Sequence, residues 1–317
     1  MTIELRLSDV DPPVAEPKRT IYRDIVNLPD PVKLGITVRY FNYDDVGLYM
    51  QITGSGTGYT FGTVNLGLLG SGSNAYINLD EFASKTKPST GDLPNGELEE
   101  NITLTLKAYT DSGYSTLKWT YERIVTVHWI NSADAAFTVD ELDNFDDGTV
   151  QGWAVANELG NVSPYPTIGV ATDYVLSTSY SCKMRQGWAA DTTADYQVRG
   201  RLYKSFTTPN KDVVYAIIDF RFGKWSYLSG DAYPYTKYQC KQSGTTILVY
   251  LGRPYDASAT DYVPVNKWMR VVVPLPKNQT VEIRIVTDWC SKHGSSIAIG
   301  FRHGIDTYID DFKIISK

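Results

Sequence analysis

The feature that most constrains this chain is an alternation of apolar and polar residues with a period of two. In ITLTLKAYT, residues 102–110, Ile102 and Leu104 point to one side, while Thr103 and Thr105 point to the other. This alternation is typical of a half-buried β-strand, because successive side chains of a strand point to opposite faces. The sequence therefore predicts a chain that is built from strands.

Similar stretches recur through the chain, and turn-rich segments separate them. The others are VKLGITVRYF, VGLYMQIT, YERIVTVHWI, VVYAIIDFRF, KWMRVVVPLP, TVEIRIVTDW, SSIAIGF and TYIDDFKIIS. Only LDEFASKT, residues 79–86, suits a short helical turn. Strands do not alternate with helical patterns, which argues against a doubly wound nucleotide-binding domain. We therefore expect an all-β fold.

The length of 317 residues and the spacing of the strands predict two tandem β-sandwiches. The first, residues 32–131, is expected to be immunoglobulin-like in architecture, although it lacks the Cys…Trp…Cys signature. Residues 132–142 show little alternation and are expected to form a linker to the second sandwich, residues 143–317. Residues 1–31 contain five prolines, which remove backbone donors, so we expect an extended N-terminal arm.

The overall charge and the first residues bear on partners and location. A net charge of −6 argues against binding to nucleic acid through a basic surface. No apolar run approaches the ~20 residues of a membrane-spanning helix, so we expect no membrane insertion. The first residues, MTIELRLSDVDPP, lack the basic and apolar regions of a signal peptide. A cytoplasmic protein, a mature fragment and a virion protein therefore stay open.

Three short motifs in the second half occur in the same order as in a known family. They are FDDGTVQGW at residues 145–153, TSYSCKM at 178–184 and TYIDDFKI at 307–314. Together they resemble carbohydrate-binding modules with the galactose-binding-like jelly-roll fold, with Cys182 at a position where the family has Leu. The resemblance covers residues 143–317 and implies a jelly-roll sandwich there. Many such domains bind no sugar, so the resemblance alone does not transfer that function.

The resemblance also implies a structural Ca²⁺ site that links the first and last strands of the jelly roll. A period of two places Asp310 on the same side of its strand as Tyr308 and Phe312. If that side faces the core, Asp310 needs a partner, because an unpaired buried carboxylate is costly. A hard cation would provide one, with Asp146 or Asp147 as a second ligand. Backbone N–H groups or an arginine would satisfy the same carboxylates, and this alternative stays open.

No catalytic constellation emerges from the sequence, so we expect no enzyme activity. The acids could form a pair that cleaves glycosides, but their positions at strand ends beside apolar residues favour a structural role. The histidines form no HExxH motif, and no G-x-S-x-G motif is present. The cysteines, Cys182, Cys240 and Cys290, include no CxxC pair and are expected to be buried apolar residues, although one disulfide among them stays open.

The segment GKWSYLSGDAYPYTKYQ, residues 223–239, concentrates aromatic residues around turn-forming ones. Loops of this kind often carry recognition. Flat aromatic rings suit stacking on the apolar C–H faces of sugars, anchoring of a protein interface, or packing on the underlying sheet. All three interpretations stay open. The candidate ligand-binding residues are Trp225, Tyr227, Asp231, Tyr233, Tyr235 and Tyr238.

Two functional hypotheses follow from these features. The first is a non-enzymatic structural or attachment protein of a virion or cell exterior, such as a spike, turret or fibre component. It would contact other copies of itself, other surface or capsid proteins, and glycans. The second is a carbohydrate-binding protein or an accessory module of a glycan-degrading system. An exterior location would also make the N-x-[ST] triplets at Asn101, Asn161 and Asn278 relevant as glycosylation sites.

Overall fold

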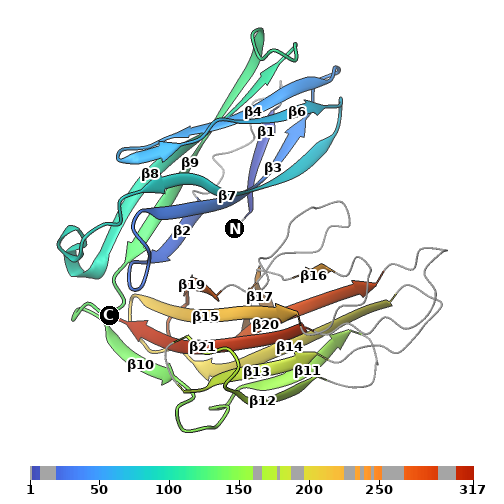
Figure 1. Ribbon diagram of the computed structural model, residues 1–317. Helices are drawn as coiled ribbons and strands as arrows, with labels where there is room; N and C mark the ends of the chain where they lie inside the picture. The colour runs from blue at the N-terminus through green and yellow to red at the C-terminus, as the bar shows by residue number, and fades with distance from the viewer. Residues whose placement is uncertain are drawn as a thin grey trace. The chain divides into compact units, whose positions relative to one another are not determined.

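The computed structural model describes most of the chain as β-strands. The described residues are 2–7, 19–159, 166–176, 179–186, 196–224, 233–235, 239–243, 246–251, 268–291 and 305–317. Within them the only helical elements are two 3-10 turns, η1 (Thr90–Asp92) and η2 (Pro94–Gly96). No helix in this part of the chain is long and apolar enough to cross a membrane. The predicted all-β sandwich fold is confirmed (Figure 1).

The first of two compact units ends at Ala135. Its strands are β1 (Thr2–Leu7), β2 (Arg19–Asp24), β3 (Val32–Asn42), β4 (Leu48–Ser55), β5 (Tyr59–Phe61), β6 (Val64–Leu69), β7 (Asn74–Lys85), β8 (Glu97–Tyr109) and β9 (Leu117–Ile130). In the described residues they form two sheets, which we name the β3 sheet (order β1-β3-β7-β5) and the β9 sheet (order β2-β9-β8-β4-β6). Apolar side chains such as Val38, Leu104 and Trp129 fill the core of this unit, all 0% exposed.

The helical turn predicted at residues 79–86 is wrong, because nearly all of these residues belong to β7. β7 pairs with β3 on one side and with β5 on the other, and Ala83 lies opposite both Leu34 and Phe61. Phe82 and Ala83 are buried at 4% and 2% exposure. Pairing with two neighbouring strands and burial in the core therefore outweigh the local helical pattern.

The N-terminal segment is extended, as predicted, and the structure shows that two of its stretches are strands of the first unit. β1 pairs in parallel with β3, and β2 pairs in parallel with β9. Ile21 and Ile25 are buried in the core at 4% and 5% exposure. Three of the prolines that suggested an arm fall at positions 12, 13 and 17, outside the described residues. β2 is thus an integral edge strand of the β9 sheet.

The second unit begins at Ala136. Its strands are β10 (Thr138–Asp143), β11 (Ala154–Leu159), β12 (Thr167–Ala171), β13 (Ser181–Gln186), β14 (Tyr196–Thr207), β15 (Val214–Lys224), β16 (Tyr233–Tyr235), β17 (Gln239–Ser243), β18 (Thr246–Leu251), β19 (Trp268–Pro274), β20 (Thr280–Ser291) and β21 (Ile305–Ser316). In the described residues they form the β21 sheet (order β12-β13-β21-β15-β19, with β10 beside β21) and the β20 sheet (order β11-β14-β20-β18-β17, with β16 beside β20). Apolar side chains of both sheets, among them Ile218, Ile283 and Phe312, pack into one core.

The linker predicted at residues 132–142 is wrong in its second half, because β10 occupies Thr138–Asp143 and pairs with the end of β21. A register shift between Val139 and Glu141 interrupts the alternation of this strand. Of its six residues, only Asp143 is buried. A short, bulged and mostly exposed strand lacks the period of two on which the sequence prediction relied.

The FDDGTVQGW motif forms a corner between β10 and β11. Its first and last residues, Phe145 and Trp153, lie in the core at 0% and 3% exposure. Between them, the Asp147 carboxylate accepts hydrogen bonds from the backbone N–H (2.9 Å) and the hydroxyl (2.8 Å) of Thr149. Gly148 has a φ of +71°, which glycine adopts without strain. The described contacts of this motif therefore give it a role in the fold.

A buried ion pair lies beside this corner. The Lys204 ammonium is 2.6 Å from the carboxylates of both Asp143 and Glu141. It also donates to the carbonyl oxygen of Gln151 at 2.9 Å. The Trp153 indole donates at 2.9 Å to the Asp143 carboxylate oxygen that Lys204 also contacts. Lys204 and Asp143 are only 8% and 4% exposed, so protein groups replace water as the partners of both side chains.

On the β9 sheet, His128 lies between two carboxylates. Its ring nitrogens are 2.9 Å from Glu99 and 3.0 Å from Glu97, and its ring lies 5.2 Å from that of Tyr22. Burial disfavours the charged ring, but the two carboxylates outweigh burial and raise the pKa of His128 above its ordinary value of 6.5. Folding therefore favours the imidazolium form.

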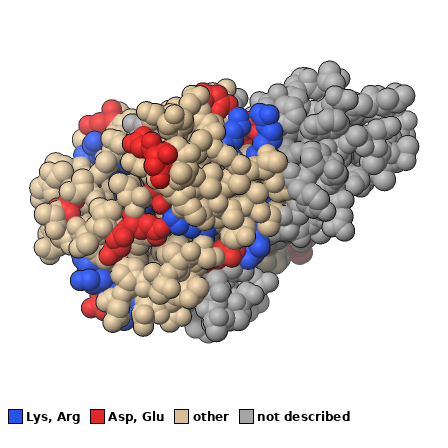
Figure 2. Space-filling view, turned by 90° about the horizontal axis from the view of Figure 1, so that it is seen from below, with Lys and Arg blue, Asp and Glu red and all other residues tan. Residues whose placement is uncertain are grey.

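Charged side chains are dispersed over the face of the molecule shown in Figure 2. Small groups of acidic and basic residues alternate there with uncharged residues, which make up most of the described area. The described part of this face therefore offers no broad basic area of the kind that binds a phosphate backbone.

Replacing Lys204 with Met keeps most of the side-chain volume but leaves the buried Asp143 carboxylate without its cation. We expect the free energy of unfolding to fall by about 3 kcal/mol, measured by urea denaturation of the full chain. Lys277→Met is the matched control, because Lys277 pairs with Asp212 at the surface, where 56% and 88% of the two side chains are exposed. The control should unfold like the unmodified chain. Equal losses in the two variants would contradict the account.

Replacing His128 with Gln should make the stability of the first unit less dependent on pH. Because the folded-state pKa is raised, the stabilisation by His128 is fully present below about pH 6.5 and is lost as the pH rises through the folded-state pKa. His128 and its two glutamates are partly exposed, so His128 stabilises the folded state by about 1 kcal/mol or less. Urea denaturation of both proteins at several pH values measures it. A variant that loses as much stability above the folded-state pKa as below pH 6.5 would refute this assignment.

Candidate functional site

A bulge in β21 decides which of its side chains leave the core. The register of β21 against β15 shifts at Asp311, the extra residue, whose φ is +53°. Ile309 and Phe312, three positions apart, both lie in the core. Tyr308 and Asp310 therefore point to the outer side of the β21 sheet. The expectation that Tyr308, Asp310 and Phe312 share one core-facing side is wrong, because it assumed an unbroken period of two.

The described part of the segment between β12 and β13, residues 172–176 and 179–180, includes a direct contact with the carboxylate of Asp310. The backbone N–H of Leu176 donates to this carboxylate at 2.5 Å, and Asp310 is 0% exposed. The Ser181 hydroxyl donates to the carbonyl oxygen of Tyr174 at 2.7 Å. These two bonds attach the segment to β21 and to the first residue of β13. The segment is therefore fixed on the outer side of the β21 sheet.

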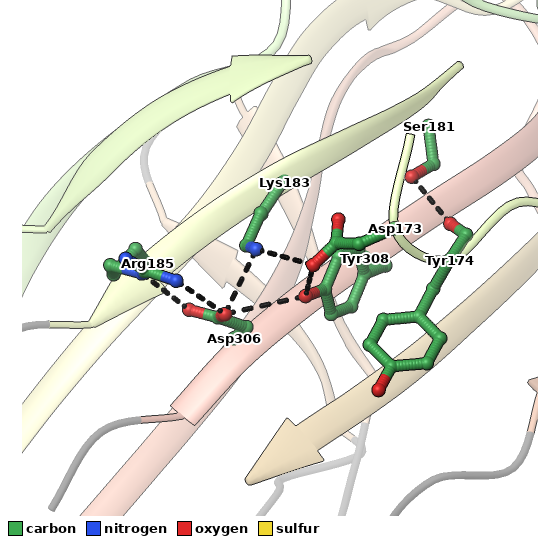
Figure 3. Close-up of polar contacts among 7 residues, drawn as sticks. All are labelled: Asp173, Tyr174, Ser181, Lys183, Arg185, Asp306 and Tyr308. Atoms are coloured by element: carbon green, nitrogen blue, oxygen red, sulfur yellow. Dashed lines mark hydrogen bonds and ion pairs between the residues drawn. The ribbon is translucent and has the colours of Figure 1, made fainter. Parts of the chain in front are cut away.

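Next to this segment, charged and phenolic side chains from the segment, β13 and β21 form one network (Figure 3). The Lys183 ammonium is 2.9 Å from Asp173 and 3.0 Å from Asp306. Arg185 donates to both carboxylate oxygens of Asp306, at 3.0 and 3.1 Å. The Tyr308 hydroxyl donates to Asp173 at 2.9 Å. The register of β13 against β21 places these partners side by side.

The network sets the protonation of its members. Burial, followed by the hydrogen bond to Asp173, raises the pKa of Tyr308. Burial alone would raise the pKa of Asp173, but its contacts with Lys183 and Tyr308 outweigh burial and lower the pKa below its ordinary value of 3.8. At neutral pH, Tyr308 is therefore a neutral donor and Asp173 an anionic acceptor.

Beside the network, Tyr174 presents an aromatic ring to solvent and is 40% exposed. The guanidinium carbon of Arg221 lies 3.7 Å from the ring centroid, and the Tyr308 ring contacts the ring edge-on at 5.3 Å. Figure 3 shows the ring on the side of the network away from Arg185. We name this surface the Tyr174 face. It consists of the exposed residues Asp173, Tyr174 and Arg185, the half-buried Lys183, and the buried Asp306 and Tyr308, which hold the others in place.

The outer side of the β21 sheet continues onto β15 and β19 with further paired groups. Arg270 donates to both carboxylate oxygens of Asp219, at 2.9 and 2.5 Å, and Asp219 is 2% exposed. Trp268, which is half-buried, lies opposite Arg221 in the register. Aromatic and paired charged side chains thus extend from the Tyr174 face across these two strands.

The Tyr174 face can bind a ligand that combines an apolar surface with hydroxyl groups. An exposed ring stacks on apolar C–H groups, while carboxylates accept and ammonium or guanidinium groups donate hydrogen bonds. The side chains already hold one another, so binding costs little conformational freedom. The arrangement is therefore ordered before any ligand is present.

The ligand-binding residues predicted from residues 223–239 lie mostly outside the described residues. The predicted residues that lie outside are Trp225, Tyr227, Asp231 and Tyr238. Tyr233 and Tyr235 are the ends of β16, where they pair with Cys290 and Asp288 of β20. Their role in binding stays a prediction.

The acids predicted to bind calcium are engaged by backbone N–H groups. Asp147 closes its own turn, and the exposed Asp146 accepts the N–H of Ser179 at 3.2 Å. Asp310 accepts the N–H of Leu176. Each N–H gives its carboxylate a partner other than a cation, which is the alternative that the sequence left open. In the described residues, no three acidic, histidine or cysteine side chains are grouped to hold a metal ion. The calcium site stays a prediction.

The Tyr174 face was missed at the sequence level, although part of its signal is present. Alternation within SCKMRQ places Lys183 and Arg185 on one side, and alternation within IDTYID does the same for Asp306 and Tyr308. The sequence does not show that these two strands are neighbours. It also does not show that Tyr174, in a turn-rich segment, packs on them.

Comparisons with known proteins give only distant similarities. No protein-family model matches the sequence, and no curated protein matches it. A structure described as the "structural basis for the promiscuous specificity of the carbohydrate-binding modules from the beta-sandwich super family" aligns with 90% of this chain and 93% of its own, at 13% identity and a TM-score of 0.32. TmCBM61 in complex with β-1,4-galactotriose aligns with 55% of this chain and 94% of its own, at 14% identity and a TM-score of 0.29. Similarity at this level carries no argument about function.

Replacing Asp310 with Ala removes the acceptor of the Leu176 N–H and should destabilise the second unit by about 1.5–3 kcal/mol, the net contribution of a hydrogen bond to a charged group. Asp310→Asn keeps an oxygen acceptor and should lose less. Thermal unfolding with excess Ca²⁺ and with EDTA separates this role from that of a metal ligand. We expect the same melting temperature of the unmodified chain in both. A Ca²⁺-dependent rise that Asp310→Asn abolishes would contradict this account and favour the calcium site.

Proposed function

We propose that this chain is a non-catalytic glycan-binding protein and that the Tyr174 face is its saccharide-binding surface. The observation that carries the proposal is the exposed ring of Tyr174, which Arg221 and Tyr308 hold beside fixed hydrogen-bonding groups. A single exposed apolar side chain is ordinary on a protein surface. An exposed ring that is held in one place beside donors and acceptors is a preformed binding surface.

A sugar ring offers the two kinds of surface that the Tyr174 face matches. Its C–H groups form a flat apolar side that stacks on an aromatic ring, and its hydroxyls both donate and accept hydrogen bonds. Lys183 and Arg185 supply donors, and Asp173, with 48% of its side chain exposed, supplies an acceptor. The acids and bases of this face are paired, so its charge is nearly balanced. This balance favours an uncharged saccharide.

The similar structures agree with this proposal but do not carry it. Two of them are described as carbohydrate-binding modules, and one of these is in complex with β-1,4-galactotriose. Their TM-scores of 0.32 and 0.29 are too low to support a transfer of function. The proposal therefore depends on the geometry around Tyr174 alone.

A structural or attachment role on a virion or cell exterior stays a prediction. No described feature of the structure bears on assembly or location. Glycan binding is compatible with such a role, because attachment to a surface glycan is itself saccharide recognition. The two hypotheses therefore share the Tyr174 face and differ in where the protein works.

Replacing Tyr174 with Ala should weaken saccharide binding about tenfold, which equals about 1.4 kcal/mol. The measurement is affinity electrophoresis of the full chain in gels that contain soluble galactan, xylan, mannan or β-glucan. We expect at least one of these polysaccharides to retard the unmodified chain and to retard Tyr174→Ala less.

Tyr203→Ala is the matched control, because its ring lies 4.6 Å from the guanidinium carbon of Arg201 in the β20 sheet of the same unit. The control should be retarded like the unmodified chain. Retardation by none of the polysaccharides, or equal retardation of all three proteins, would overturn the proposal. Release of reducing sugar from a retarding polysaccharide would show that the chain is an enzyme.

A further inference from the structure

A second aromatic surface lies at one end of the β9 sheet, in the first unit. Leu68 of β6 lies opposite Tyr49 of β4, and Tyr109 of β8 lies between Tyr49 and Leu117 of β9. Leu68 and Leu117 are 60% and 51% exposed. Met50, which follows Tyr49, is 0% exposed in the core, so this row is on the outer side of the sheet.

Tyr114, from the turn between β8 and β9, packs on this row. Its ring centroid lies 6.2 Å from that of Tyr49 and 5.5 Å from that of Tyr109, edge-on in both cases. The backbone N–H of Gly67 donates to its hydroxyl at 3.2 Å. Its φ of +56° is costly for a residue with a Cβ, whereas glycine adopts it freely. The chain thus has a tyrosine at a position where the backbone favours a glycine. Compared with glycine, tyrosine adds the ring at this position.

The turn that carries Tyr114 is fixed by the Asp111 carboxylate. This carboxylate accepts hydrogen bonds from the backbone N–H groups of Thr116 (2.6 Å), Gly113 (3.0 Å) and Ser115 (3.2 Å). The bonds from Thr116 and then from Ser115 lower the pKa of Asp111 to about 2. The carboxylate therefore stays ionised at neutral pH, and the turn presents the Tyr114 ring in a preformed position.

Uncharged hydrogen-bonding side chains extend the aromatic row along β4 and along β6 with the residue before it. The Gln51 carboxamide donates to Asn65 at 2.8 Å, and the Tyr109 hydroxyl donates to Gln51 at 3.3 Å. The hydroxyls of Thr63 and Thr53 are 3.5 Å apart. Phenol, carboxamide and hydroxyl groups thus lie together beside the aromatic row.

We infer that this surface, the Tyr114 face, binds an uncharged oligosaccharide. It consists of Tyr49, Gln51, Asn65 and Tyr114, and Tyr109, which is 8% exposed, supports their rings from within. The rings offer an apolar area to C–H groups, and each carboxamide both donates and accepts, as neighbouring sugar hydroxyls require. Lys107, opposite Gln51, adds one positive charge at the border, which is too little to select an anionic ligand.

The low charge of the Tyr114 face, a single lysine at its border, decides between ligand classes. A nucleic acid needs several cations in one place, and an ionic protein segment needs complementary charges. An uncharged polyhydroxylated ligand needs neither and uses both the rings and the carboxamides. The Tyr114 face belongs to the other unit from the Tyr174 face, so the inference does not rest on the proposed function.

Tyr114→Gly is the decisive variant, because glycine suits the φ of this position while the ring is removed. Isothermal titration calorimetry of the full chain uses neutral trisaccharides, with β-1,4-galactotriose and cellotriose among them. We expect Tyr114→Gly to bind at least tenfold more weakly at one site per chain. Tyr114→Phe keeps the ring and should bind within about twofold of the unmodified chain. Melting temperatures of both variants verify that the first unit stays folded.

Tyr174→Ala, alone and combined with Tyr114→Gly, separates the two surfaces. Two sites per chain should fall to one in each single variant and to none in the combined variant. Binding that only Tyr174→Ala removes would overturn this inference and leave the proposed function intact. Binding that only Tyr114→Gly removes would support the inference and overturn the proposed function. Absence of all saccharide binding, including the case in which the Tyr114 face captures a protein instead, would overturn the inference.

Discussion

The surface of the second unit depends on one extra residue in its last strand. An unbroken β21 would send Asp310 to the same side as Phe312, into a core that has no place for an unpaired carboxylate. The bulge at Asp311 sends Phe312 inward and keeps Asp310 outside. There the carboxylate accepts the N–H of Leu176 and fixes the segment that carries Tyr174. One backbone irregularity thus serves both the core and the Tyr174 face.

The two units use the same physical device to hold a tyrosine ring in one position. In the second unit, Asp310 accepts a backbone N–H from the segment that carries Tyr174. In the first, Asp111 accepts several backbone N–H groups of the turn that carries Tyr114. A carboxylate that is bonded to backbone donors restricts a loop more directly than apolar packing does, because each bond fixes a peptide group. The ordering of both loops is therefore achieved on folding, before any ligand arrives.

Much of the fold could be predicted from the sequence, because a strand that buries one face alternates apolar and polar residues with a period of two. The predictions for β3, β8 and β15 succeeded for this reason. They failed where the periodicity is interrupted or overridden. β10 is short, bulged and mostly exposed, and pairing on two sides made a strand of the residues whose local pattern favoured a helical turn. The sequence carries no direct record of a bulge, so the side to which Asp310 points could not be derived from it.

The site was harder to predict than the fold, because a surface on a sheet combines residues that are distant in the sequence. Lys183 and Asp306 are neighbours only because β13 pairs with β21. The ligand-binding site was predicted at residues 223–239 because aromatic residues are concentrated there. The described surface depends instead on Tyr174, which has few aromatic neighbours in the sequence. What distinguishes Tyr174 is the set of contacts that hold it, and contacts between distant segments become visible only in three dimensions.

A crystal structure of the full chain with a bound neutral trisaccharide would test the central claim most directly. The account predicts a sugar ring stacked against the Tyr174 ring, with residues 173–176 and the Asp310–Leu176 hydrogen bond unchanged. A saccharide bound elsewhere in the second unit, or bound only after this segment has left the sheet, would contradict it.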